Sequence, residues 1–503
     1  MKKKYMIGVD CGTTNVKAVL FDTNGHELMT ASRENCVLAK GNCMEQDMEA
    51  LWKNVKACLI ELGEWFHSID GELVGLGVSG QGEGLWAIDK YGKPVRNAIL
   101  WNDARAAELT EELKKRADYP FMRKILGTYF KNGSTLVLMN WFRRQEPELF
   151  ERTAYFFSCK DYIRYRLTGK IFWELSDASA SCVNIETRQY AYEVFEALGI
   201  PEIGKKLPPL MTACDCGGQI LPEVSAETGM PERLPVSGGM LDVLATSAGL
   251  GAVHPGDTCV ILGTTGMTQS IMETYKPDEQ LSGWGLTIDG VSYCRGIGCM
   301  AATPNLDWAV KTFFPEEKPS EVFARMEKEL AERRPGDSGL IYHPHISLAG
   351  ERAPFFCPEA TAQFLGIRQD TSRMDLLYAV LEGVAMAIRD CLKQNETLQT
   401  VCLSGGGAKS SVWSQIISDV LGVTVLVTES SELTAKGAAL TAAMMAGIIK
   451  NTEEVKERFL TIKKRYEPEP QKHLQYMELY KIYKSTQKAM EPFWEWRAKT
   501  WTF

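Results

Sequence analysis

Two similar glycine–threonine turns, about half a chain apart, constrain the fold of this 503-residue chain more than any other feature. Each turn lies between two apolar runs, so each is predicted to join two buried strands. Glycine lets the backbone turn sharply, and consecutive N–H groups in such a turn can form a concave anion-binding site. The turns are Asp10-Cys11-Gly12-Thr13-Thr14 and Gly263-Thr264-Thr265-Gly266. The pair predicts two domains that each offer one phosphate-binding turn to a shared nucleotide; two ordinary hairpin turns are the alternative.

The order of predicted elements around the two turns is also similar. Residues 5–37 are predicted to form three antiparallel strands, residues 48–66 a helix with apolar side chains at helical spacing, and residues 73–78 a further strand. After residue 257 the same order returns, with a helix near 306–314 and a strand at 401–403. We therefore predict an α/β chain with two domains, 1–248 and 249–503.

Composition excludes several classes of function. The net charge is −8 and the sequence pI is about 5.6, which argues against nucleic acid or an anionic membrane surface as the main partner. The fourteen cysteines are scattered and form no zinc-type spacing, so they are predicted to be reduced thiols of a cytoplasmic protein. The longest apolar helical segment, residues 437–449, is too short to span a bilayer.

Two aspartates are the candidates for phosphate chemistry. Asp10 ends a predicted buried strand beside the first turn, where a carboxylate can hold Mg²⁺ next to bound phosphates. Asp242 follows Gly238-Gly239 and is predicted to lie in the first turn of a helix, whose dipole favours the ionised carboxylate. Such a group can accept the proton of a hydroxyl that attacks a phosphoryl group. The alternative for both residues is a capping role in their own turns.

Two further segments have the composition of ligand-binding loops. Gly405-Gly406-Gly407 lies between a predicted strand and a predicted helix, where the backbone can approach a flat ligand such as adenosine. Gln81 and Glu83 lie in a glycine-rich loop after the strand at 73–78, and the segment Trp101 to Arg105 adds Asp103 beside an aromatic surface. Amide and carboxylate groups beside a Trp suit a sugar or polyol; a surface loop with a buried Trp is the alternative.

These segments together resemble the FGGY family of carbohydrate kinases, which shares the actin, hexokinase and Hsp70 ATPase fold. The resemblance covers about residues 5–447 and is most specific at Ala362–Ile367, Asp375-Leu376 and Ala379–Glu382, where the family's second signature is matched. The first signature is similar at Gly133–Gln145, except that Leu138 stands where a lysine is usual.

The resemblance implies two ribonuclease H-like domains, each a mixed sheet with flanking helices, and an ATP cleft between them. It implies Asp242 as the catalytic base and substrate contact, Asp10 as the Mg²⁺ residue, and sugar contacts at Gln81, Glu83 and Asp103. The ATP-binding residues would be Gly12, Thr13, Thr14, Gly263, Thr264, Thr265, Gly405 and Gly406.

The loop at residues 80–85 bears on the substrate. D-xylulose kinases tend to carry Met-His at the positions of Gly82 and Glu83, and glycerol kinases Arg-Glu, whereas this loop looks more like that of L-xylulose or erythritol kinases. Gly82 is predicted to open room, and Glu83 to accept two hydroxyl hydrogen bonds.

The resulting prediction is a kinase that transfers the γ-phosphate of ATP to a terminal hydroxyl of a ketopentose of the xylulose type. A kinase of erythritol or glycerol is the first alternative. A non-catalytic sugar-binding protein and a chaperone-like ATPase of the same fold are the others. The aromatic C-terminus (Phe493, Trp494, Trp496 and Trp501) makes a homodimer plausible.

Overall fold

The computed structural model describes residues 2–275, 283–392, 398–429 and 431–500. The chain forms two compact units, each built from three stretches of sequence. Unit 1 contains residues 1–254, 272–294 and 430–461, and unit 2 contains residues 255–271, 295–429 and 462–503. The predicted domain ranges stay a prediction, because these units group residues by contact and interleave along the chain.

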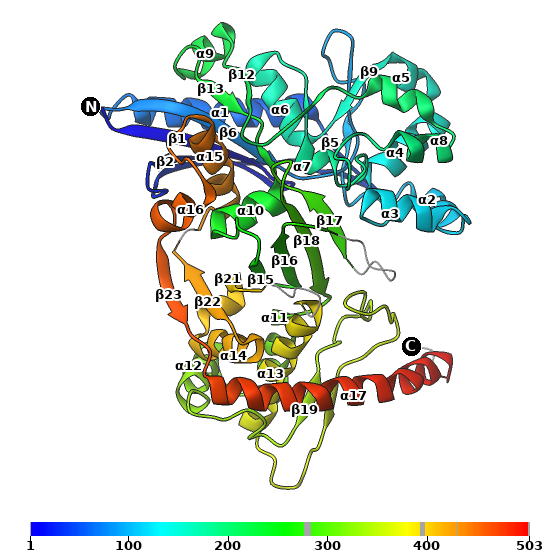
Figure 1. Ribbon diagram of the computed structural model, residues 1–503, viewed down its shortest axis with the longest axis vertical. Helices are drawn as coiled ribbons and strands as arrows, with labels where there is room; N and C mark the ends of the chain where they lie inside the picture. Colours follow the sequence, from blue (N-terminus) through cyan, green and yellow to red (C-terminus); the bar gives the residue numbers. More distant parts are fainter. Residues whose placement is uncertain (1, 276–282, 393–397, 430, 501–503) are drawn as a thin grey trace. The chain divides into compact units, whose positions relative to one another are not determined.

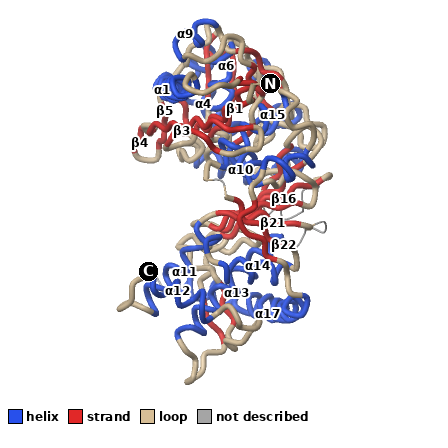
Figure 2. The backbone as a smooth tube through the Cα atoms, turned by 90° about the vertical axis from the view of Figure 1, so that its left-hand side faces the viewer, coloured by secondary structure: helices blue, strands red, loops and turns tan. Residues whose placement is uncertain are grey.

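The main sheet of unit 1 has the order β12-β13-β6-β1-β2-β3, and β14 also pairs with β6 (Figures 1 and 2). β1, β2 and β3 are antiparallel neighbours, whereas β6, reached after helix α1, pairs with β1 in parallel. The predicted strands and the predicted helix at 48–66 are thereby confirmed. The strands are β1 (Lys4–Cys11), β2 (Asn15–Asp22), β3 (Glu27–Glu34), β6 (Glu72–Gly80), β12 (Cys216–Gln219), β13 (Pro235–Ser237) and β14 (Met240–Leu241).

Helices and small sheets complete unit 1. The helices are α1 (Met48–Phe66), α2 (Ala107–Lys114), α3 (Tyr119–Leu126), α4 (Thr135–Gln145), α5 (Pro147–Arg152), α6 (Cys159–Thr168), α7 (Leu175–Ala178), α8 (Tyr192–Ala197), α9 (Pro222–Thr228), α10 (Asp242–Leu250), α15 (Leu433–Met445) and α16 (Thr452–Glu454). The short strands are β4 (Leu38–Lys40), β5 (Cys43–Gln46), β7 (Trp86–Asp89), β8 (Ala98–Ile99), β9 (Thr153–Phe157), β10 (Trp173–Glu174), β11 (Leu210–Met211) and β17 (Trp284–Thr287).

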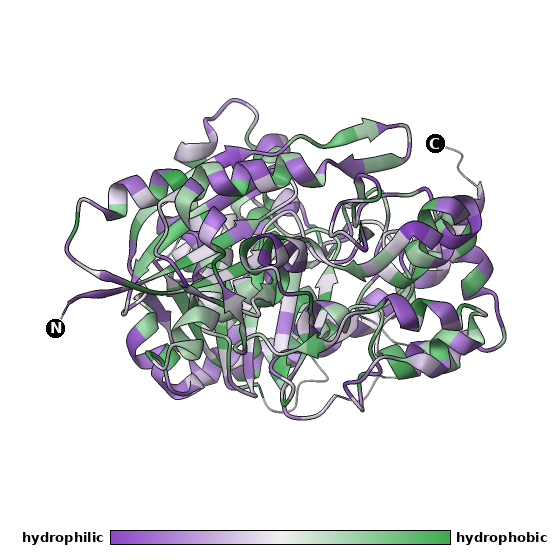
Figure 3. Ribbon diagram, turned by 90° about the horizontal axis from the view of Figure 1, so that it is seen from above, coloured by the Kyte–Doolittle hydropathy of each residue, from purple (hydrophilic) through white to green (hydrophobic). Residues whose placement is uncertain are grey.

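Helices α1 and α15 cover opposite faces of the unit 1 sheet. In β1, Ile7 and Val9 belong to the apolar core that includes α1, whereas Gly8 between them lies against the backbone of α15. This follows from strand geometry, since successive side chains point to opposite faces. Many helices carry both hydrophobic and hydrophilic bands (Figure 3), as helices with one face on a core must.

Unit 2 repeats the same strand pattern. The second large sheet has the order β17-β18-β16-β15-β21-β22-β23, with β15 antiparallel to β16 and parallel to β21, so the predicted second set of elements is confirmed. The strands are β15 (Asp257–Leu262), β16 (Gly266–Met272), β18 (Tyr293–Cys299), β19 (Ile341–His343), β20 (Gln363–Leu365), β21 (Thr400–Ser404), β22 (Thr424–Thr428) and β23 (Ile462–Tyr466). The helices are α11 (Thr303–Phe313), α12 (Pro319–Glu329), α13 (Arg373–Leu392), α14 (Ser411–Leu421) and α17 (Pro470–Thr500).

The core of unit 2 forms where helices α11, α13 and α14 pack together, and α17 packs on α14. Tyr476 and Tyr483 of α17 are buried in this core, and Leu479 and Tyr480 pack against it, so these four side chains form a packing face of the helix. Among the described residues, no helix is both long and apolar enough to cross a membrane.

Candidate functional site

Three parallel strands of unit 1 end at the same edge of the sheet. β6 pairs in parallel with β1 on one side and with β14 on the other, and Ser79 of β6 aligns with both Asp10 and Met240. Ligands of open α/β sheets bind outside the carboxyl ends of the strands. The structure thus brings three predicted site residues, Asp10, Gln81 and Asp242, to that edge of the sheet.

The first glycine–threonine turn joins β1 to β2 and is held through its carbonyl oxygens. The backbone N–H of Asn35 donates to Thr14 O at 2.8 Å, and its side-chain Nδ2 donates to Gly12 O at 2.8 Å. The Thr13 hydroxyl donates to Gln81 Oε1 at 3.0 Å. Because these bonds do not use the N–H groups of the turn, its geometry is compatible with an anion site.

Asp10 has the surroundings expected of a residue that holds a cation. Its Oδ1 is buried and has no hydrogen-bond partner. Burial raises the pKa of Asp10 to about 6, against the opposing effect of Lys17, which forms a 2.7 Å ion pair with Glu432. An unpaired buried carboxylate oxygen is costly unless a cation or a donor reaches it, so Asp10 fits a divalent metal.

No group of three or more His, Cys, Asp or Glu side chains within the described ranges could hold a metal ion without further ligands. A divalent cation at Asp10 would therefore depend on other ligands, such as nucleotide phosphates and water, which is the usual arrangement for Mg²⁺.

Asp242 is the first residue of α10. Gly239, at φ +80°, lies so close to β6 that an added Cβ would come within 2.0 Å of Val78 O, which brings β14 and the start of α10 against the sheet. Asp242 Oδ1 accepts the N–H of Val243 at 2.7 Å. Burial, together with the charges of Asp10 and Asp177, raises the pKa of Asp242 to about 8. A carboxylate with this pKa is a stronger base than an exposed aspartate.

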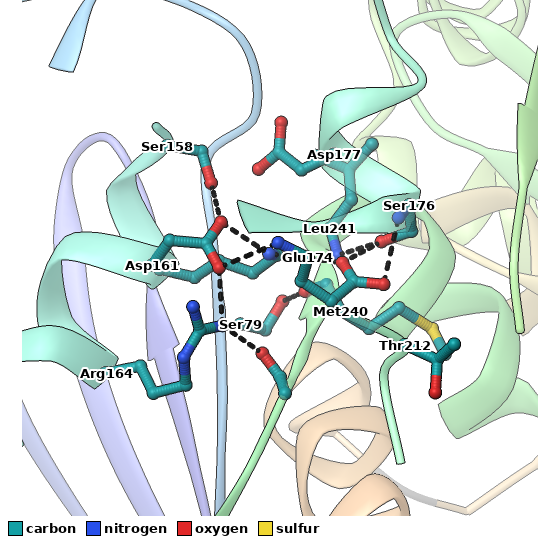
Figure 4. Close-up of polar contacts among 12 residues, drawn as sticks. Ser79, Ser158, Asp161, Arg164, Glu174, Ser176, Asp177, Thr212, Met240 and Leu241 are labelled. Carbon is teal, nitrogen blue, oxygen red and sulfur yellow. Dashed lines mark hydrogen bonds and ion pairs between the residues drawn. The ribbon is translucent and has the colours of Figure 1, made fainter. Parts of the chain in front are cut away.

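A buried ionic network supports the strand that precedes Asp242 (Figure 4). Ser79 Oγ donates to Met240 O at 2.8 Å, and the Leu241 N–H donates to Ser176 Oγ at 3.0 Å. Glu174, the N-cap of α7, in turn accepts hydrogen bonds from the Ser176 N–H and the Ser176 hydroxyl. The charged members of the network have no exposed side-chain surface: Lys160, Asp161, Arg164 and Glu174. The network therefore fixes the backbone from which Asp242 projects.

The raised pKa of Asp242 predicts a pH-dependent cost in stability. The unfolded chain titrates this group near pH 4, so between pH 4 and 8 the native state binds more protons and wild-type stability falls as pH rises. At pH 4 we expect the ligand-free Asp242→Asn variant to unfold at the same temperature as the wild type. Toward pH 8 its unfolding temperature should exceed that of the wild type at the same pH by an increasing margin. Thermal unfolding at several pH values measures this. A variant with a lower unfolding temperature at pH 8 would contradict it.

Two of the predicted sugar contacts already have partners within the protein. The Gln81 amide donates to Gln46 Oε1 at 2.8 Å and accepts from Thr13. Asp103 is buried, and its two oxygens accept from Met44 N and from the Arg105 side chain. Their sugar-binding roles stay predictions. The bonds of Asp103 stabilise the loop that contains it.

Glu83 keeps one carboxylate oxygen free of protein partners. Its Oε2 pairs with Lys131 Nζ at 2.8 Å, whereas its buried Oε1 has no hydrogen-bond partner. The residue has φ +56°, an uncommon conformation for a side chain other than glycine, and its N–H donates to Asp177 Oδ1 at 3.3 Å. The expectation that Glu83 accepts two hydroxyl hydrogen bonds stays a prediction, and Lys131 already bonds to one of its two oxygens.

The space beside Gly82, which the sequence predicts to be open, is filled. A Cβ added at Gly82 would come within 2.1 Å of Leu241 Cδ1, so the space is filled by the residue that precedes Asp242. Gly82 instead permits close packing of the loop at residues 80–85, called the sugar loop below, against β14.

The second glycine–threonine turn lies in unit 2 between β15 and β16. Thr303, at the start of α11, donates from its backbone and its hydroxyl to Gly263 O, both at 2.9 Å, and Ala302 N donates to Thr264 O. As in the first turn, carbonyl oxygens take these bonds. The Gly405 loop follows β21, which runs parallel to β15, so Gly263, Thr264, Thr265, Gly405 and Gly406 lie at one end of this sheet.

A pocket of about 430 Å³ lies beside the Gly405 loop. Gly406 and Gly407 line one side, and Phe323, Met326 and Leu306 give it an apolar wall. Gly405, at φ +93°, is packed against Leu262 O, where a Cβ would come within 2.5 Å. The size and lining suit an aromatic base and its sugar.

The sequence analysis missed the pocket wall and Asp177. Phe323 and Met326 lie on α12, which carries ordinary amphipathic spacing, and no motif sets them apart. Asp177 lies in the four-residue helix α7 and reads as a capping residue in sequence. Only the spatial neighbourhood of Glu83 and Asp242 distinguishes it. Leu138, at the unusual position of the first signature, is fully buried in α4.

Comparisons with known proteins agree with this architecture. Residues 5–249 match the model of the N-terminal domain of the FGGY family of carbohydrate kinases, and residues 259–446 match that of its C-terminal domain. The chain is 31% identical to a xylulose kinase of Bacillus subtilis over 96% of each chain. It is 30% identical to an erythritol kinase of Brucella abortus over 98% of each. The crystal structure of a xylulose kinase from Rhodospirillum rubrum is similar with a TM-score of 0.87, at 26% identity, covering 98% of this chain and 100% of that one.

Both halves of the chain are thus matched by one family, in the order in which the two sheets occur. The predicted fold class and enzyme class are confirmed. The chain belongs to the FGGY family of carbohydrate kinases and is an ATP-dependent phosphotransferase that acts on an alcohol group of a carbohydrate.

Proposed function

We propose that this kinase transfers the γ-phosphoryl group of ATP to a terminal hydroxyl of a ketopentose of the xylulose type, as a cytoplasmic enzyme. Xylulose kinases among its full-length relatives support the substrate class. The observation that carries the chemistry is Asp242, a half-buried carboxylate of raised pKa at the carboxyl end of parallel strands, as Asp10 also is.

Both units contain residues that we propose to contact the nucleotide. Gly12, Thr13 and Thr14 in unit 1, and Gly263, Thr264 and Thr265 in unit 2, would bind phosphate oxygens through backbone N–H groups. Gly405 and Gly406 would border the adenosine, for which the adjoining pocket has room. Asp10 would hold Mg²⁺, which when bound neutralises the negative charge of the phosphates.

Asp242 is the proposed general base. As the sugar oxygen forms its bond to the γ-phosphorus, the bond from that phosphorus to the departing ADP oxygen breaks, and the hydroxyl proton passes to the Asp242 carboxylate. Alignment of the hydroxyl and exclusion of water would supply much of the remaining rate enhancement. Gln81, Glu83 and Asp103 are the proposed determinants of sugar orientation.

A small polyol is the second candidate substrate. An erythritol kinase is 30% identical to this chain over nearly its whole length, which is close to the value for the xylulose kinase. Single hydroxyl contacts decide between such substrates, since a site that hydrogen-bonds one hydroxyl rejects analogues that lack it.

An ADP-release screen with pentuloses, tetritols, glycerol and hexuloses tests the proposal. We expect turnover to be stimulated most by a ketopentose of the xylulose type. Strongest stimulation by erythritol would replace the first candidate by the second. Strong ATP hydrolysis that no sugar stimulates would indicate a chaperone-like ATPase, and sugar binding without ADP release would indicate a sensor. The homodimer expected from the sequence is tested separately by sedimentation, which measures the molecular mass in solution.

A further inference from the structure

Asp177 is a buried carboxylate next to the proposed sugar loop. It is 2% exposed and belongs to α7, which lies more than sixty residues before Asp242 in the sequence. Its Oδ1 accepts the Glu83 N–H at 3.3 Å and would lie 3.6 Å from a Cβ at Gly82. Its charge also contributes to the raised pKa of Asp242. Asp177 therefore lies near both the sugar loop and the proposed base.

The second oxygen of Asp177 has no partner. Oδ2 is buried without a hydrogen bond, and in Figure 4 no dashed line joins the Asp177 carboxylate to the ionic network beside it. The nearby Ser158 hydroxyl, which has a single hydrogen, donates to Asp161 instead. The cations of the network, Lys160 and Arg164, are bonded to Asp161. A buried acceptor in this state is costly unless a bound ligand or water supplies a donor.

Glu83, like Asp177, has one carboxylate oxygen that lacks a hydrogen-bond donor. Its Oε1 is buried and unpartnered, in a residue that is only 9% exposed. Burial raises the pKa of Asp177 to about 7. In the ionised form a carboxylate accepts hydrogen bonds and donates none, so each free oxygen then requires a donor. The nearby cation, Lys131, already pairs with Glu83 Oε2. Adjacent hydroxyls of a polyhydroxy compound supply such donors, whereas a carboxylate on the ligand would add a further negative charge.

We propose that Asp177 is a further substrate-binding residue, and that with Glu83 it selects a neutral polyhydroxy acceptor over a sugar acid. The inference rests on the proposed function, because the acceptor is the compound that this kinase phosphorylates. It assigns the free Oδ2 of Asp177 and the free Oε1 of Glu83 to two hydroxyls of the acceptor.

The variant Asp177→Asn tests the first part. An Asn side chain keeps an oxygen that can accept the Glu83 N–H but replaces the free acceptor by an amide donor. We expect the KM for the best neutral acceptor of the wild type to rise by roughly 10- to 100-fold, the range for one hydrogen bond to a charged group. The KM for ATP should change less than twofold, and the unfolding temperature without ligand should not fall. Steady-state kinetics and thermal unfolding measure these quantities.

Asp215→Asn and Asp177→Ala are the comparison variants. Asp215 likewise accepts a backbone N–H, from Thr212 at 2.8 Å, but it is exposed, so its replacement should leave all constants unchanged. If Asp177→Asn behaves as wild type and only Asp177→Ala fails, Asp177 merely supports the Glu83 backbone and the inference is wrong. A lower unfolding temperature in Asp177→Asn with parallel losses for ATP and sugar would also overturn it.

Aldonates of matched chain length test the second part. We expect the wild type to phosphorylate them at least tenfold less efficiently, by kcat/KM, than the neutral acceptor. Equal efficiency would overturn the selection of neutral substrates. Absence of transfer to any neutral sugar or polyol by the wild type would instead count against the proposed function, and the two failures are thus distinguishable.

Discussion

Replacing Asp242 by Ala is expected to lower kcat for sugar phosphorylation by about 10²- to 10⁴-fold, the usual contribution of a general base. The affinity for ATP should stay nearly unchanged, because the proposed nucleotide contacts lie on the glycine turns and at Asp10. The variant keeps the network that fixes β14, since Leu241 N and Met240 O, rather than the Asp242 side chain, make its bonds. Steady-state kinetics and nucleotide titration by calorimetry provide the two measurements.

The matched control is Asp215→Asn, which alters an exposed carboxylate of the same unit. If Asp242→Ala retains turnover within tenfold of wild type, Asp242 is not the base. A loss of ATP affinity comparable to the loss of kcat would show that the residue serves nucleotide binding instead.

Replacing Gly77 by Ala is expected to destabilise unit 1 by about 3 kcal/mol or more, at the upper end of overpacking effects. A Cβ there would come within 1.8 Å of Ala438 O in α15, and the same distance separates a Cβ at Gly8 from Ala435 O. The obstructing atoms belong to backbone, so no side-chain rotation relieves the clash. Urea denaturation measures the change in the free energy of unfolding.

Gly75→Ala is the control, because Gly75 lies on the same strand and faces the same helix. Its Cβ would meet Met445 and Ala442 atoms at 3.2 to 3.4 Å, and the nearest of them is the flexible Met445 Cε. We expect a much smaller loss of stability. Equal effects for Gly75→Ala and Gly77→Ala would contradict the close approach of α15 to β6.

The close packing of α15 also bears on the proposed active site. Gly437 of α15 lies against Ala245 O of α10, and Gly249 of α10 lies against Leu433 O of α15, at Cβ distances of 1.9 and 2.0 Å. Helix α15 thus fills the space between the sheet and the helix that begins with Asp242. A partly folded Gly77→Ala variant should therefore lose activity as well as stability.

Local patterns were sufficient to predict the elements at the start of each sheet. The apolar spacing of residues 48–66 predicted α1, and the two glycine–threonine turns predicted the β1–β2 and β15–β16 connections. Asp10 was found because it ends a predicted strand beside the first glycine–threonine turn, and Asp242 because it follows Gly238-Gly239 at the start of a predicted helix. These signals are encoded within a few neighbouring residues, where sequence patterns are informative.

Features that depend on distant segments could not be predicted. Residues 437–449 were recognised only as an apolar helical segment, whereas the structure forms α15 at residues 433–445 and packs it on β1 and β6, near the start of the chain. The filling of the Gly82 space by Leu241 depends on a similarly distant contact. So do the pairing of Glu83 with Lys131 and the position of Asp177. Sequence spacing does not determine which side chain fills a space or takes a hydrogen bond.

The most direct test of the central claim is ³¹P NMR of the wild-type reaction with ATP, Mg²⁺ and the preferred acceptor from the ADP-release screen. The account predicts a new phosphomonoester signal coupled to the two protons of a terminal CH₂ group, growing in step with ADP. Inorganic phosphate as the only new signal besides ADP, with the acceptor unmodified, would contradict it.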